Sequence, residues 1–125
     1  ARGGSDTPFG WEGKAFDMRK ANCDAEGSAG ETLPVSRYGS WANGFGLHDM
    51  IGNVREWTAD GVDADRKLRV LRGGSWTLDP DYCRAAKRSY GRPNIRDGGI
   101  GFRVCRGSPI DPRDAAPLGA DTLSR

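Results

Sequence analysis

Two acidic side chains near the middle of the chain have a spacing that could hold a hard cation. Asp49 and Glu56 flank a Gly-Asn pair, residue types that favour a turn, and such a turn could bring both carboxylates together. Calcium takes carboxylate and backbone carbonyl oxygens as ligands. The spacing is not that of an EF-hand loop, so two separate exposed carboxylates are the alternative interpretation. The oxygen-rich stretch 22–30 is more simply explained as a solvated turn than as a second cation site.

The thiol chemistry of the chain is limited. Its three cysteines are Cys23, Cys83 and Cys105, no two of them form a CxxC motif, and His48 is the only histidine. A zinc site needs four ligands, usually cysteine or histidine at close spacing, so this composition argues against one. An odd number of cysteines excludes complete pairing within the chain. We expect buried free thiols rather than a single disulfide bridge.

Composition predicts one small, turn-rich domain. The chain has 125 residues, 36% hydrophobic residues, 19 glycines and a mean hydropathy of -0.68. Such a chain has a modest core, which four tryptophans and four phenylalanines partly enlarge.

Charge and hydropathy exclude two classes of partner. The formal net charge is +2, from 19 basic and 17 acidic residues, which is too balanced to predict nucleic-acid binding. No apolar run approaches the roughly 20 residues needed to span a bilayer. We therefore expect a soluble protein, either cytoplasmic or exported, with no membrane span.

The elements that would position a site are two short strands and the loop between them. Residues 69–71 form an apolar run that ends at Gly73-Gly74, which predicts a buried strand, and residues 101–105 predict a second one. The segment between them has almost no periodicity. A long irregular loop in a compact domain is usually either functional or disordered.

The other segments have weaker patterns. Residues 34–38 could form a short strand, and an apolar patch at 44–47 follows a predicted Asn43-Gly44 turn. Residues 107–125 contain three prolines and no apolar period, which predicts a tail that lies on the surface or is disordered.

Three segments together resemble a known family. Gly46-Leu-His-Asp-Met-Ile-Gly-Asn-Val-Arg-Glu-Trp57, Arg69-Val-Leu-Arg-Gly-Gly-Ser-Trp76 and Ile100-Gly-Phe-Arg-Val104 are similar to the signature segments of the formylglycine-generating enzyme (sulfatase-modifying factor) family. The resemblance implies an α+β, C-type-lectin-like fold that is irregular and rich in glycine. It covers about residues 1–106 and implies that they are the C-terminal part of a domain. The N-terminal half would then be missing, cleaved away or present as a separate chain.

The resemblance also implies a metal site and casts doubt on catalysis. Family members bind structural calcium through side chains that match Asp49 and Glu56 and through carbonyls that match Gly52 and Val54. The family's oxidases bind copper through two cysteines separated by four residues, since soft thiolates suit Cu(I). Here Cys83 matches the second cysteine, but the first position is Leu78.

The composition of the loop suggests a different role. The repeated framework of the loop consists of Pro80, Cys83, Arg84, Ala85, Ala86, Lys87, Arg88, Arg92, Pro93 and Arg96. The other loop positions contain no Lys, Glu, Gln, Met or Trp, five types that are common on ordinary surfaces. Diversity-generating retroelements rewrite adenines in Asn-type codons, which excludes these five types, and their variable proteins resemble this family. Ordinary drift within the family is the alternative. The predicted ligand-binding positions are Thr77, Leu78, Asp79, Asp81, Tyr82, Ser89, Tyr90, Gly91, Asn94, Ile95, Asp97, Gly98 and Gly99.

Two hypotheses of function follow. In the first, the chain is a non-catalytic, variable binding protein that presents residues 77–99 to a protein or surface ligand, as a paratope does. Framework arginines would pair with acidic neighbours such as Asp60, Asp63 or Asp65. In the alternative, it is an oxidoreductase of the formylglycine-generating or pyoverdine-maturation type, which would use copper and Cys83 with groups from the N-terminal half.

Overall fold

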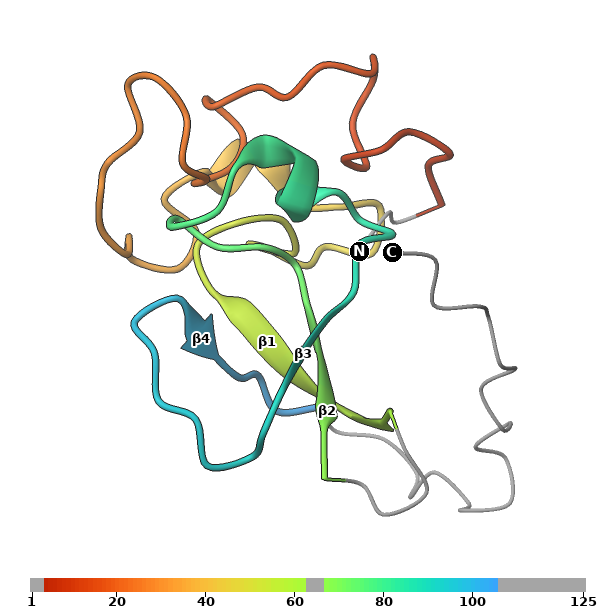
Figure 1. Cartoon of the computed structure of the whole chain (residues 1–125). Coiled ribbons are helices and arrows are strands. Elements are labelled where there is room, and N and C mark those ends of the chain that lie inside the picture. Colours follow the sequence, from red (N-terminus) through yellow and green to blue (C-terminus); the bar gives the residue numbers. More distant parts are fainter. Residues whose placement is uncertain (1–3, 63–66, 106–125) are drawn as a thin grey trace.

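The computed structural model describes residues 4–62 and 67–105. It has two 3-10 helices, η1 (Gly39–Trp41) and η2 (Pro80–Cys83). Its strands are β1 (Arg55–Gly61), β2 (Arg69–Arg72), β3 (Ser89–Gly91) and β4 (Ile100–Gly101). Figure 1 shows the four strands at one end and the irregular loops of residues 4–54, with η2, at the other. The described residues contain no α-helix, so the helical part of the expected α+β class is not seen in them. No helix in this part of the chain is long and apolar enough to cross a membrane.

The sheet has the strand order β3-β2-β1-β4. β2 pairs with β1 and with β3 in antiparallel fashion, whereas β4 pairs with β1 in parallel. The predicted strand at 69–71 is confirmed, because Val70 and Leu71 are fully buried in the central strand β2. The strand ends where Gly73 and Gly74 take left-handed φ values of 99° and 73°, a region that glycine enters at little cost.

Two strand predictions need correction. The strand predicted at 101–105 is limited to Ile100–Gly101, because β1 pairs with it only at Arg55 and Glu56. Beyond it, Phe102 and Val104 are 73% and 87% exposed. Residues 34–38 form a turn, since Ser36 has a φ of 65°, which a strand does not allow.

The predicted turn at Asn43-Gly44 is present. The Gly46 amide donates to the Asn43 carbonyl at 2.8 Å, and the Asn43 side chain accepts hydrogen bonds from the amides of Phe45 and Leu47. The apolar residues of this patch remain exposed to solvent, Phe45 by 73%.

The core next to η2 is built around an aromatic cluster. Phe9 stacks on Trp11 at 5.3 Å between ring centroids and meets Phe16 edge-on at 5.5 Å. The buried members of this core are Phe9, Ala21, Cys23, Ile51 and Cys83. Aromatic side chains therefore supply much of the apolar area, as the composition predicted.

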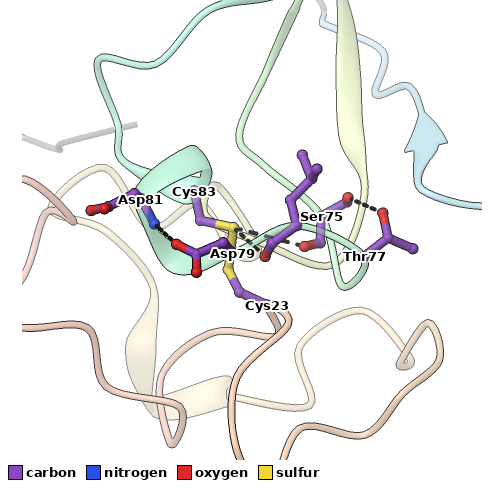
Figure 2. The surroundings of a disulfide bond; sticks show 7 residues. Cys23, Ser75, Thr77, Asp79, Asp81 and Cys83 are labelled. Carbon is purple, nitrogen blue, oxygen red and sulfur yellow. Dashed lines mark hydrogen bonds between the residues drawn. A yellow bond between two sulfur atoms is a disulfide. The ribbon is translucent and has the colours of Figure 1, made fainter.

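A disulfide joins Cys23 to Cys83, which corrects the expectation of buried free thiols. Figure 2 shows the bond between η2 and the loop that carries Cys23. The two residues are 60 apart in sequence, and a backbone hydrogen bond from the Asp24 amide to the Leu78 carbonyl, at 2.9 Å, also joins the two segments. Cys105 is a free and exposed cysteine. The sequence separation explains why spacing alone did not reveal the pair.

Candidate functional site

The segment 77–99, here called the display segment, connects β2 to β4 and passes through η2 and β3. Most of the predicted ligand-binding positions in it are exposed, and Ser89 in β3 is half-buried. Tyr82 and Tyr90 are 49% and 50% exposed, so each ring presents a large surface to solvent. The exposed positions are Thr77, Asp79, Asp81, Tyr82, Tyr90, Asn94, Ile95, Asp97 and Gly98.

Three predicted positions face inward and leave the candidate set. Leu78 is half-buried and packs against the core cluster. Gly91 is buried, and a Cβ there would lie 3.0 Å from the Trp57 ring. Gly99 is also buried, and a Cβ there would lie 2.9 Å from the Ser75 hydroxyl oxygen. Gly91 and Gly99 therefore cannot accept larger side chains without displacing their neighbours.

The first part of the display segment is fixed by its own turn chemistry. Asp79 caps η2, because its side chain accepts a hydrogen bond from the Asp81 amide at 2.9 Å, and Pro80 occupies the first turn. The Ser75 and Thr77 hydroxyls lie 2.9 Å apart (Figure 2). The exposed side chains of this part therefore stand on a well-defined backbone.

Arginines fix the middle and the end of the segment. The Arg72 guanidinium donates to the carbonyls of Ala86 and Lys87 at 3.0 and 3.2 Å, and its burial lowers the pKa of that guanidinium. Arg55 pairs with Asp97 at 3.5 Å. Of the acidic partners predicted for the framework arginines, Asp60 instead lies close enough to Arg72, in β2, to raise the pKa of that guanidinium. The other two, in 63–66, lie outside the described residues.

Each exposed tyrosine of the segment has a cation against its ring. Lys87 Nζ lies 4.4 Å from the centre of the Tyr82 ring, and the Arg88 guanidinium lies 5.8 Å from that of Tyr90. Cation–π contacts restrain the two rings, and each tyrosine remains about half exposed to solvent. This arrangement can contact a partner through aromatic surface and hydrogen bonds.

Cys83 is not available as a metal ligand in this state. Its side chain is fully buried and bonded to Cys23. A thiolate is the form of cysteine that binds metals or acts as a nucleophile, and a disulfide has none. The position that would supply a second thiolate in the display segment is Leu78.

Asp49 and Glu56, the predicted cation ligands, are joined by an arginine. Arg103 pairs with both carboxylate oxygens of Glu56 and donates to the carbonyls of His48 and Asp49 at 3.1 and 3.2 Å. The pairing with Glu56 raises the pKa of Arg103. The Asp49 side chain accepts a hydrogen bond from the Ser36 amide at 3.0 Å. In the residues that the structure describes, no three His, Cys, Asp or Glu side chains group as a metal site.

Two residues of this region have contacts that the sequence did not predict. Arg103 lies in the segment expected to be a strand, where a lone cation could have suggested a partner for Glu56. Asn22 is buried within the stretch expected to be a solvated turn, and it forms a β-bridge with Gly52. Its Nδ2 donates to the Glu31 carbonyl at 2.9 Å, while its buried Oδ1 has no hydrogen-bond partner among the described residues.

Comparison with known proteins assigns the chain to a family. Residues 1–108 match the family described as the sulfatase-modifying factor enzyme 1-like domain. The chain belongs to this sulfatase-modifying factor family. The family also contains the formylglycine-generating enzymes, which confirms the resemblance found in the three sequence segments.

Relatives in the sulfatase-modifying factor family differ in their named activities. The chain is 34% identical over 108 residues to the inactive C-alpha-formylglycine-generating enzyme 2 of Bos taurus, covering 82% of this chain and 34% of that protein. It is 32% identical over 146 residues to the formylglycine-generating enzyme of Mycobacterium tuberculosis, covering 88% of this chain and 48% of the other. The chain thus spans less than half the length of either, and identity alone does not decide activity.

A solved structure of a variable protein is similar as well. Treponema denticola variable protein 1 superposes with a TM-score of 0.63 and 32% sequence identity, covering 82% of this chain and 41% of that one. The formylglycine-generating-enzyme type of fold, with short strands and few helices, is therefore shared with a protein named for its variability.

Proposed function

We propose that this chain is a non-catalytic, ligand-binding member of the family, with a C-type-lectin-like scaffold that presents the display segment to a protein or surface ligand. The observation that carries the proposal is the state of Cys83, which is fully buried in a disulfide while nine of the predicted positions in the display segment are exposed. The display segment offers contact surface rather than a thiolate pair.

The chemistry of the exposed positions suits recognition. Tyrosine supplies rigid contact area at a low entropic cost, and Ser, Gly and Asn supply adaptable hydrogen bonds. Tyr82 and Tyr90 provide the first, and Ser89, Asn94 and Gly98 the second. Similarity to a variable protein supports diversification of these positions by a retroelement.

The alternative is an oxidoreductase that uses Cys83 and copper. It would require reduction of the Cys23–Cys83 bond, exposure of a buried sulfur and a second ligand in place of Leu78. Similarity to an active formylglycine-generating enzyme favours it, but the residues of the display segment do not.

A pair of matched libraries tests the proposal. Randomising Thr77, Asp81, Tyr82, Tyr90 and Asn94 together should leave most variants folded, with melting temperatures within about 10 °C of the parent. Each surface substitution usually changes stability by about 0.5 kcal/mol or less, so five together change it by about 2.5 kcal/mol or less. Randomising the inward positions Leu78, Gly91 and Gly99 is the control and should unfold most variants.

The outward library should also yield binders when selected against an immobilised test protein such as lysozyme. Equal loss of folding in the two libraries, or no binder from the outward one, would contradict a replaceable binding face.

We also propose structural calcium at the side chains of Asp49 and Glu56 and the carbonyls of Gly52 and Val54. A carboxylate oxygen has two lone pairs, and Arg103 uses one on each oxygen of Glu56, so a cation could share this carboxylate. One oxygen of Asp49 has no hydrogen-bond partner among the described residues. The residues therefore fit a hard cation, which would cross-link the two ends of segment 49–56.

Removal of calcium should lower the melting temperature. A ligand present at about 100 times its Kd stabilises the folded state by about 2.7 kcal/mol, which is a shift of several degrees. Asp49→Ala, which removes the side-chain oxygens, should abolish the difference between melting curves with calcium and with chelator. Asp60→Ala removes an exposed carboxylate outside the site and should keep the difference. Superimposable curves of the unaltered chain would exclude the calcium site.

A further inference from the structure

An open groove borders the display segment at the turn that follows β3. It has a volume of about 550 Å³ and is lined by Lys67, Leu68, Arg92, Pro93 and Asn94. Asn94 is one of the exposed positions of the display segment, so the groove is continuous with the proposed binding face.

Backbone contacts hold both walls of the groove. The Ile95 amide donates to the Arg92 carbonyl at 3.0 Å and closes the turn that carries Asn94. On the other wall, the Val62 amide donates to the Leu68 carbonyl at 3.1 Å. The walls adjoin because β2 and β3 pair Arg69 with Gly91. Backbone hydrogen bonds and strand pairing therefore hold both walls of the groove.

The polar groups of the groove are suited to carboxylates. Arg92 is exposed, and within the described part of the chain it has no carboxylate partner. A guanidinium binds a carboxylate through two parallel hydrogen bonds, and the Asn94 amide can donate a third. Leu68 and Pro93 offer apolar surface to the methylene groups of an acidic side chain.

The display segment itself has a net positive charge. The display segment has five basic residues, Arg84, Lys87, Arg88, Arg92 and Arg96, and three acidic ones, Asp79, Asp81 and Asp97. Two of the three carboxylates are already engaged, Asp79 as the cap of η2 and Asp97 with Arg55. The segment therefore presents an excess of positive charge to a partner.

We propose that this groove binds an acidic segment of the partner protein, with Arg92 and Asn94 holding one of its carboxylates. The inference rests on the proposed function and specifies the chemistry of the ligand. A protein fits better than a nucleic acid, since the whole chain has a net charge of only +2 and a pI of about 8.6, below the range typical of nucleic-acid-binding domains.

Fluorescence anisotropy with a labelled octaglutamate peptide tests the groove, with octaglutamine and an oligothymidylate as comparison probes. Octaglutamate should bind at low salt, more weakly at high salt, and more tightly than either comparison probe. Arg92→Glu should weaken binding about tenfold, because it removes one charge pair and adds a repulsion. Arg84→Glu makes the same charge change at an exposed residue that does not line the groove, and should change binding by less than about twofold.

Equal weakening by the two variants would overturn the proposal, because binding would then depend on net charge alone. Tighter binding of oligothymidylate, or no binding of octaglutamate at low salt, would overturn it as well. Melting curves of both variants check that they fold. If the groove does not bind octaglutamate, the outcome of the library test is unchanged. The groove and the binding face are therefore tested separately.

Discussion

Replacing Cys23 and Cys83 together by alanine should lower the melting temperature by about 10 °C or more. A disulfide restricts the unfolded chain, and one that links residues 60 apart contributes about 2–5 kcal/mol to the free energy of unfolding. Both side chains are fully buried, so the truncation also removes packing in the core around Phe9. For a chain of this size each kcal/mol corresponds to several degrees.

Cys105→Ala is the matched control for this loss of stability. Cys105 is free and exposed, and its replacement should leave the melting curve unchanged. Thermal unfolding followed by circular dichroism measures all three proteins. If the double alanine variant has the same melting temperature as the unaltered chain, the disulfide does not hold the display segment to the core.

Gly52→Ala should reduce the free energy of unfolding by about 2–5 kcal/mol, from two separate causes. Gly52 has a φ of 76°, which costs an alanine about 1–2 kcal/mol. A Cβ there would also collide with the backbone carbonyl of Asn22, with the carbonyl carbon at 2.8 Å. The backbone cannot move aside easily, because the Asn53 amide donates to that same carbonyl and the Gly52 amide to the Gly73 carbonyl.

Gly46→Ala separates the two causes. Gly46 has a φ of 74°, but no atom beyond Gly46 itself and its two chain neighbours lies within 4 Å of the position of its Cβ. The Gly46→Ala variant should therefore lose only the conformational part of the free energy of unfolding, about 1–2 kcal/mol in a denaturant titration. Equal losses in the two variants would mean that the approach of Gly52 to Asn22 contributes nothing to stability.

The sequence predicted features that depend on local residue types. The β2 strand followed from Val70 and Leu71 before two glycines, and the turn at Asn43-Gly44 from its residue types. The family was predicted from three sequence segments, because their order and spacing can be matched even where the chain has no regular periodicity. Exposure of both tyrosines of the display segment also agreed with their expected role.

Features that depend on long-range contact were not predicted. The Cys23–Cys83 bond joins residues 60 apart, and Arg103 reaches Glu56 over a separation of 47 residues. The inward orientation of Gly91 and Gly99 depends on Trp57 and Ser75, which lie elsewhere in the chain. Glycine is compatible with both a variable surface and a crowded interior, so its presence alone could not distinguish them.

The central claim is that the display segment binds a partner and does not perform copper chemistry. Its most direct test is an assay for aldehyde formation on a cysteine-containing peptide, in oxygen, with and without copper(I). The Mycobacterium tuberculosis formylglycine-generating enzyme would serve as the positive control. We expect no aldehyde above the level of peptide and copper alone, because Cys83 is buried in a disulfide and Leu78 offers no sulfur. Copper-dependent aldehyde that disappears in Cys83→Ala would contradict this account.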